Sequence, residues 1–200
     1  MVGQYGLIKR TTDGGDTWLP VSSGTRNWLN AVSFADANTG TAVGDNGTIL
    51  RTSDGGNTWT SEFSTTVVTL QAVAMPDPAT ATVAGSFDNI ILRTTDSGAS
   101  WAAQSSGVKN TLSGVWFTDS NTGTVVGGQG ACSPSISTIL RTTDGGATWR
   151  QQVTGSNRAL LSVFFIDSNT GWAVGEAGTI LHTSTGGEPP ADMVTQSSQE

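Results

Sequence analysis

The stretch GTILRTSDGGNTW, Gly47 to Trp59, decides the fold of this 200-residue chain. It carries a hydroxyl, an aspartate, a glycine, a second hydroxyl and a tryptophan at fixed offsets: Thr52, Asp54, Gly56, Thr58 and Trp59. Gly56 permits the positive φ of a tight hairpin turn, and Asp54 can accept hydrogen bonds from turn N–H groups and a nearby hydroxyl. The tryptophan then returns a large apolar surface to the sheet. The stretch therefore predicts a strand, a self-bonded turn and the start of a return strand.

The same signature recurs along the chain. The other intact copies are Thr11, Asp13, Gly15, Thr17 and Trp18; Thr94, Asp96, Gly98, Ser100 and Trp101; and Thr142, Asp144, Gly146, Thr148 and Trp149. A fifth copy keeps Thr183 and Gly187 but has Thr185 and Pro190 in the aspartate and tryptophan places. Successive aspartate places, at 13, 54, 96, 144 and 185, are 41, 42, 48 and 41 residues apart. A period of this size predicts a repeat architecture.

Each full repeat reads as four short strands. From Leu29 to Phe34 apolar and polar residues alternate, which predicts a strand, and further strands are expected at 41–44, at 48–53 and after Trp59. A single four-stranded sheet cannot bury both of its faces, whereas twisted sheets stacked in a ring can. We therefore predict an all-β propeller of Asp-bearing repeats. The apolar positions expected to fill the layers between blades are Val32, Phe34, Val43, Ile49, Leu50 and Trp59.

The repeats divide the chain into about five blades. Their expected bounds are 1–28, 29–69, 70–111, 112–159 and 160–187. The first repeat lacks its first strand, and the last has Pro189 and Pro190 where a fourth strand would need backbone donors. We expect an excerpt of a longer propeller; a complete ring of five blades, two of them thin, is the alternative. The polar segment 188–200 is expected to be a disordered tail.

The composition of the chain excludes several classes of function. The net charge of −7 argues against a nucleic-acid partner, and no apolar run approaches the ~20 residues of a membrane span. The single cysteine, Cys132, excludes an internal disulfide and a cysteine zinc site, and His182 is the only histidine. We expect no metal or other cofactor. Low lysine with abundant Ser, Thr, Asn and Gly favours an extracytoplasmic protein, although no signal peptide is visible at the N-terminus.

The pattern [ST]-x-D-x-G-x-[ST]-W resembles the Asp-box, or BNR, repeat. The longer pattern V-x-F-x-D-x-N-T-G-x-A-V-G-x-x-G-T-I-L-R-T-x-D-G-G-x-T-W is similar to the repeat of the photosystem II stability/assembly-factor-like propellers, and it covers the chain from Val2 to about Gly187. This resemblance implies a β-propeller. It leaves the activity open, because Asp-boxes occur in sialidases, xyloglucan-cleaving glycosidases, sortilin-type receptors and non-enzymatic assembly factors.

Two acidic series are candidates for catalysis or calcium binding. One consists of the box aspartates, and the other is Asp36, Asp77, Asp119 and Asp167, each after a first strand. Every member occupies a turn of a different repeat, so the members cannot converge on one substrate. We interpret both series as turn residues. The remaining carboxylate candidates for glycoside hydrolysis, Asp45, Asp88 and Glu176, also fall in turns.

An arginine precedes each intact box, at Arg10, Arg51, Arg93 and Arg141. These residues are the first candidates for a binding surface, as a basic rim for an acidic peptide or a carboxylate, although we favour a packing role for them. The alternative is that each arginine stem packs between blades and its head pairs with an aspartate of the repeat. Sialidase chemistry, as the resemblance implies, would need a Tyr–Glu pair, and the only tyrosine is Tyr5 near the N-terminus.

We assign no catalytic residue. The sequence favours a non-enzymatic binding or scaffold propeller that recognises a protein partner, with a glycan as a second possible ligand. The alternative is part of a secreted Asp-box glycoside hydrolase, sialidase- or xyloglucanase-like, or a carbohydrate-binding propeller.

Overall fold

The computed structural model describes residues 1–86, 90–129 and 136–187. Within these ranges the chain is made of strands and turns, with short 3-10 segments at η1 (Gln4–Gly6), η2 (Asp45–Gly47) and η3 (Glu176–Gly178). No helix in the described ranges has the length and apolar character needed to cross a membrane. Asp88, Cys132 and the tail that we expect to be disordered, 188–200, lie outside the described residues.

The strands form five antiparallel sheets, which we number blades 1 to 5 in chain order. Blade 1 pairs β1 (Ile8–Arg10) with β2 (Leu19–Val21), and Val2 adds an isolated bridge to Ile8. Blade 2 contains β3 (Leu29–Phe34), β4 (Gly40–Gly44), β5 (Ile49–Thr52) and β6 (Thr60–Glu62). Blade 3 contains β7 (Leu70–Ala74), β8 (Ala81–Gly85), β9 (Ile91–Thr94) and β10 (Ala102–Gln104).

Blade 4 contains β11 (Thr111–Phe117), β12 (Gly123–Gln129), β13 (Ile136–Thr142) and β14 (Arg150–Gln151). Blade 5 contains β15 (Leu160–Phe165), β16 (Gly171–Gly175) and β17 (Ile180–Thr183). In every blade each strand pairs with the next one along the chain. This meander follows from the short turns between strands, which allow only antiparallel neighbours.

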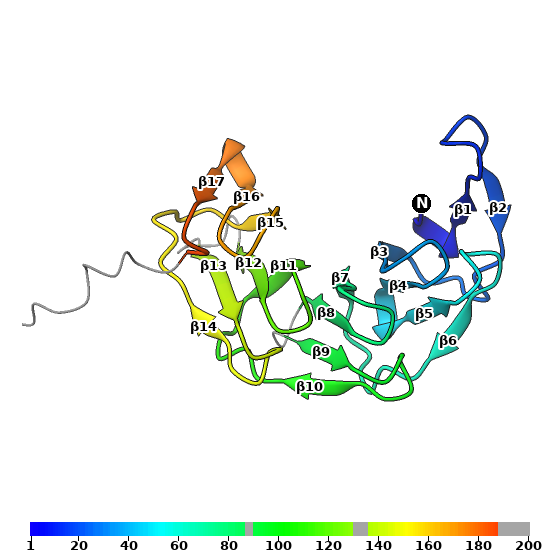
Figure 1. The fold of residues 1–200 in the computed structure, drawn as a ribbon, viewed down its shortest axis with the longest axis horizontal. Coiled ribbons are helices and arrows are strands. Elements are labelled where there is room, and N and C mark those ends of the chain that lie inside the picture. Colours follow the sequence, from blue (N-terminus) through cyan, green and yellow to red (C-terminus); the bar gives the residue numbers. More distant parts are fainter. Residues whose placement is uncertain (87–89, 130–135, 188–200) are drawn as a thin grey trace, which may run out of the picture.

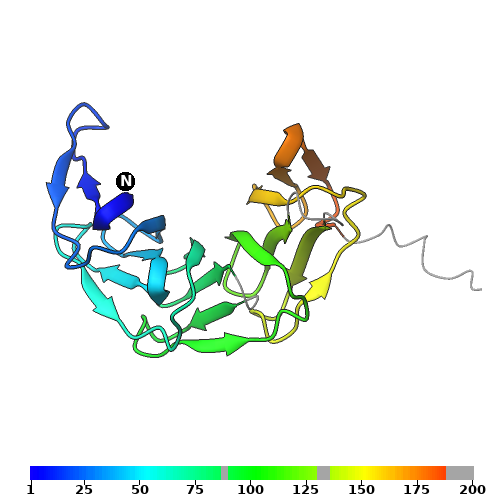
Figure 2. The ribbon, with the colours of Figure 1, turned by 180° about the vertical axis from the view of Figure 1, so that it is seen from behind.

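The blades follow one another around an open arc, as Figures 1 and 2 show from opposite sides. The first strands β3, β7, β11 and β15 line the inner side of the arc, and β2, β6, β10 and β14 lie along its outer side (Figure 1). The predicted all-β propeller of four-stranded repeats, incomplete in its first and last blades, is confirmed.

Apolar layers between successive blades hold the arc together. Along β7, Val73 packs back into a cluster with Val43 and Ile49 of blade 2, while Ala72 packs forward into a cluster with Leu112 of blade 4. The alternation of side chains along one strand therefore serves two interfaces. Each inner blade buries its two faces against its neighbours, as in other repeat proteins.

Exposure rises at the two ends of the arc. Phe34, predicted to lie in a layer, is 43% exposed, whereas its counterpart Phe117 is 6% exposed. The reason is that Phe34 faces blade 1, which lacks a first strand. At the other end, Ile180 of blade 5 is 70% exposed, whereas its counterpart Ile49 of blade 2 is completely buried.

Candidate functional site

The Asp-boxes are closed hydrogen-bonded turns after the third strand of each blade. In blade 2, the Thr52 hydroxyl donates to Asp54 Oδ1 at 2.8 Å and accepts from the Gly56 N–H at 2.9 Å. Thr58 donates its N–H to Asp54 Oδ1 at 2.9 Å and its hydroxyl to Oδ2 at 2.7 Å. Both carboxylate oxygens are therefore used within the turn. The same bonds recur in blades 1, 3 and 4.

These bonds stabilise the ionised form of each box aspartate. The N–H and hydroxyl of Thr58 lower the pKa of Asp54 to about 2. The pKa values of Asp96 and Asp144 are also lowered to about 2, and the largest causes are the hydrogen bonds from the Ser100 and Thr148 hydroxyls. The pKa of Asp13 is also lowered, chiefly by the Thr11 hydroxyl. A general acid needs the opposite shift, so these carboxylates are suited to holding turns.

We expect acid to weaken the turns between about pH 4 and pH 2. Each box aspartate has a folded pKa below its unfolded value of ~3.9, so its stabilisation is present above that value and is lost as the pH falls through the folded pKa. Asp54→Asn should lower the Tm at pH 7 and flatten the acid limb of a plot of Tm against pH, measured by circular dichroism. Asp16→Asn, at an exposed position inside the first box but not at the box aspartate, is the control. Equal profiles for the two variants would contradict this role of the box aspartate.

The second acidic series caps the turns after the first strands. Asp36 Oδ1 accepts from the Asn38 and Thr39 N–H groups at 2.7 and 2.8 Å, and Asp77, Asp119 and Asp167 bind their turns in the same way. These turns also touch the boxes, because the Gly55 N–H donates to the Asn38 carbonyl at 2.8 Å. Both acidic series thus lie in one layer of turns.

The four arginines predicted to bind a partner each reach into the next blade. Arg93 and Arg141 are buried, and their Nη1 groups donate to Thr82 and Thr124 on the neighbouring strand of their own sheets at 2.7 and 3.0 Å. Across the interface, the arginines donate to backbone carbonyls: Arg10 to Gly55, Arg51 to Pro78, Arg93 to Ser120 and Arg141 to Ser168. Across the interface the partners are thus carbonyl oxygens of turns, where the packing interpretation expected an aspartate of the repeat. Within its own blade, Arg51 Nε also lies 4.0 Å from Glu62 Oε1. A rim that binds a ligand stays a prediction.

Aromatic rings complete these arginine contacts. The guanidinium carbon of Arg93 lies 5.0 Å from the centroid of Phe117, and that of Arg141 lies 5.1 Å from the centroid of Phe165. Cations at this distance from a ring face are attracted to it. Arg93 and Arg141 therefore hold the first strand and the first turn of the next blade.

A second inter-blade contact joins the fourth strands of blades 2 and 3 to the next box tryptophan. The Trp101 indole N–H donates to Glu62 Oε2 at 3.0 Å, and the Trp149 indole N–H donates to Gln104 Oε1 at 3.2 Å. Gln104 Nε2 also donates to the Gly145 carbonyl at 2.9 Å. Sequence reasoning missed this contact. Its signal is a Glu or Gln three residues after a box tryptophan, at Glu62, Gln104 and Gln152.

Glu62→Gln is expected to stabilise the protein at neutral pH. The Glu62 side chain is 11% exposed, and burial raises its pKa, so the stability it gives is present at low pH and is lost as the pH rises through the folded pKa. Glutamine keeps an acceptor for Trp101 and removes the buried charge. We expect a gain of about 1 kcal/mol at pH 7, which is about 2–4 °C in Tm for a chain of this size. The pairing lost with Arg51, at 4.0 Å, is weak.

The matched reverse change is Gln104→Glu in blade 3. It should destabilise the protein at pH 7, because it places a carboxylate beside the Gly145 carbonyl. In the native protein this carbonyl accepts a hydrogen bond from Gln104 Nε2. Thermal melts at pH 4 and pH 7 would check both variants. A fall in Tm for Glu62→Gln at pH 7 would contradict the expectation.

A cavity of about 710 Å³ lies between blades 4 and 5. Its apolar walls include Val126 and Ile139 of blade 4 and Val163, Phe165 and Leu181 of blade 5. The polar side chain of Gln152 also lines it. A cavity with apolar walls and a few polar groups is the usual form of a ligand site.

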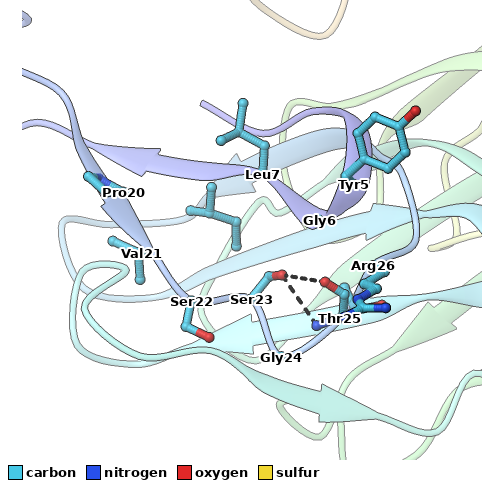
Figure 3. Close-up of a pocket in the computed structure, with 11 residues that line it drawn as sticks. Tyr5, Gly6, Leu7, Pro20, Val21, Ser22, Ser23, Gly24, Thr25 and Arg26 are labelled. Atoms are coloured by element: carbon cyan, nitrogen blue, oxygen red, sulfur yellow. Dashed lines mark hydrogen bonds between the residues drawn. The ribbon is translucent and has the colours of Figure 1, made fainter.

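A shallower depression of about 480 Å³ lies on blade 1 (Figure 3). The Ser23 hydroxyl donates to the Thr25 carbonyl and accepts from the Thr25 N–H, at 3.2 and 3.3 Å. The Ser64 and Ser106 hydroxyls close the corresponding loops of the next two blades. The polar groups of this depression therefore serve the loop itself. Across the described residues, no three His, Cys, Asp or Glu side chains gather to form a possible metal site.

The arc of sheets and its self-bonded turns define an Asp-box β-propeller. The chain belongs to the Photosynthesis system II assembly factor YCF48 family, whose model matches residues 16–106 and 99–195. The family resemblance predicted from the repeat is thereby confirmed. A comparison with curated proteins gave no significant match.

Solved structures show the same fold. YCF48 bound to D1 peptide matches with a TM-score of 0.59 and 22% identity, over 75% of this chain and 47% of that one. YCF48 from Cyanidioschyzon merolae matches with a TM-score of 0.59 and 22% identity, over 78% and 53%. A GH74 enzyme from Niastella koreensis matches with a TM-score of 0.69 and 16% identity, over 90% and 33%. The chain thus spans about half the length of the YCF48 chains that it matches.

Proposed function

We propose that this chain is a non-catalytic binding propeller that holds a segment of a protein partner outside the cytoplasm. The observation that carries the proposal is the match to the assembly-factor family along most of the chain. An assembly factor acts by holding another protein, and a rigid propeller presents loops for this purpose.

The chemistry of the repeated carboxylates supports this proposal. Box aspartates such as Asp54 use both oxygens within their own turns and have lowered pKa values. Glu62, whose side chain is 11% exposed, holds Trp101. A glycosidase needs one carboxyl group with a raised pKa and another on the opposite side of the scissile bond. Glu62 meets only the first requirement, and its carboxylate lies between two blades.

Exposed apolar side chains in the loops between blades offer contact area. Phe63, Val67 and Val153 are exposed in these loops. Near the N-terminus, Tyr5 and Trp28 are both exposed and form an edge-to-face pair with ring centroids 6.3 Å apart. Exposed aromatic side chains are enriched where proteins bind partners.

The D1 peptide named for YCF48 is the first partner to test. Isothermal titration of the 200-residue chain with this peptide should show saturable binding, and a scrambled peptide of the same composition is the control. The arginine rim can be tested in the same assay with Arg51→Lys, which keeps the charge. A loss of binding at unchanged Tm would support direct contact with the Arg51 guanidinium, and unchanged binding would exclude that contact. Equal signals from the two peptides would contradict recognition of this partner.

The second candidate is part of a GH74-like glycoside hydrolase. The structural match over 90% of this chain leaves this candidate open, because a match at 16% identity shows the fold alone. A panel of plant and bacterial polysaccharides incubated with the protein would decide between the two. Release of reducing sugar would overturn the non-catalytic proposal.

A further inference from the structure

The cavity between blades 4 and 5 repeats the environment of a box tryptophan without the tryptophan. Trp101 is buried with Val43 and Ile49 of blade 2 and with Val73 and Leu92 of its own blade. The residues at the same positions around the cavity are Val126, Ile139, Val163 and Leu181. In blade 5, Pro190 stands in the tryptophan place, and no tryptophan follows Trp172 in the sequence.

The acceptor for an indole N–H is also in place. Gln152 Nε2 donates to the Gly186 carbonyl at 2.9 Å, as Gln104 Nε2 donates to the Gly145 carbonyl at 2.9 Å. A Cβ built on Gly187 would lie 2.1 Å from Gln152 Oε1, and one built on Gly146 would lie 2.1 Å from Gln104 Oε1. The two amides therefore have the same orientation, and Gln104 Oε1 accepts from Trp149.

The strand beside the cavity has a free edge within the described residues. In blade 2, β5 pairs with β4 on one side and with β6 on the other, through Ile49, Leu50 and Arg51. In blade 5, β17 pairs with β16, and the described part of the chain contains no strand on its other side. The unpaired N–H and C=O groups of such an edge are a template for another strand.

We propose that an extended peptide segment carrying a tryptophan binds here as the fourth strand of blade 5. It pairs antiparallel with β17, and its indole enters the cavity with the N–H on Gln152 Oε1. This is strand addition, in which backbone bonds give affinity and a side-chain pocket gives specificity. The proposal rests on the proposed function, because the segment belongs to a protein partner. It names the site and the residue type that the site selects.

The chain supplies its own probe. The peptide Thr143–Val153, TDGGATWRQQV, contains the turn, tryptophan and fourth strand of blade 4. A fluorescein-labelled copy titrated with the full 200-residue chain should show saturable anisotropy. The copy with Trp149→Ala should bind at least ~30-fold more weakly, as expected for loss of a buried aromatic anchor. The copy with Trp149→Phe should fall between them, since it fills the cavity without the N–H donor.

Variants of the chain locate the binding. Ala173→Leu should abolish binding because Ala173 lines the cavity, while Val174→Leu, at the next position of the same strand, should leave it unchanged. Gln152→Met keeps the size of the side chain but removes the hydrogen-bond acceptor. It should therefore weaken binding of the tryptophan peptide and leave binding of the phenylalanine peptide unchanged. Circular dichroism would confirm that each variant is folded.

Several results would overturn the proposal. The first is equal binding of the tryptophan and alanine peptides, and the second is an equal loss of peptide binding in Ala173→Leu and Val174→Leu. The third is a dimer of the chain, seen by light scattering, that Ala173→Leu dissociates, because the occupant of the cavity would then be a second copy of the chain. Titration with the D1 peptide distinguishes a failure of this inference from a failure of the proposed function. If that peptide binds and TDGGATWRQQV does not, only the inference fails.

Discussion

Replacing Trp101 with alanine is expected to cost about 3–5 kcal/mol of unfolding free energy. The side chain is 6% exposed, lies in the layer between blades 2 and 3 and donates its indole N–H to Glu62. Its loss would leave a cavity in that layer and a buried acceptor without a donor. Urea unfolding followed by circular dichroism would measure the effect.

Trp18→Ala is the matched control in blade 1. Trp18 occupies the same place in its repeat but is 40% exposed, so its truncation should cost no more than about 1 kcal/mol. Equal costs for the two variants would show that the box tryptophans do not hold the layers.

The second large effect is expected at Gly127, the glycine near the end of β12. A Cβ built there would lie 2.0 Å from the Thr111 carbonyl oxygen and 2.9 Å from Leu112 Cα. These are backbone atoms of the paired strand, so relief requires the two strands to separate. Overpacking of this kind costs typically 1–3 kcal/mol, and we expect Gly127→Ala to reach about 3 kcal/mol. Gly44, Gly85 and Gly175 make the same close approach in their blades.

Gly107→Ala is the control for this prediction. Gly107 has a φ of +71°, but a Cβ there would meet nothing within 4 Å. Its substitution should therefore cost only the backbone preference, about 1 kcal/mol. Chemical denaturation of both variants would compare the two costs. A smaller effect at Gly127 than at Gly107 would contradict the steric account.

The turns and strands could be predicted from the sequence because their causes are local. Asp54 accepts hydrogen bonds from Thr52 and Thr58, and the Gly56 N–H donates to the Thr52 hydroxyl, all within four residues. Such contacts depend on residue type and spacing, and the period then gives the number of blades. The burial of Val43 and Ile49 follows from the same repeat.

Contacts between blades could not be predicted in the same way. The acceptors of Arg93 and Arg141 are backbone carbonyls in the next repeat, and a carbonyl carries no sequence signal. The exposure of Phe34 depends on a strand that is missing from blade 1. The cavity beside Gln152 arises where one side chain of the repeat is replaced, so it becomes visible only when the blades are compared in space.

Two kinds of side-chain contact join each of blades 2 and 3 to the blade that follows it. Arg51 and Arg93 each donate to the blade that follows their own, and Glu62 and Gln104 each accept from the tryptophan of the blade that follows. During translation, which folds domains from the N-terminus, each blade leaves the ribosome after the side chains that will hold it are already in place. We therefore expect the blades to be added one at a time from the N-terminus. Refolding from denaturant lacks this order and exposes every docking face at once.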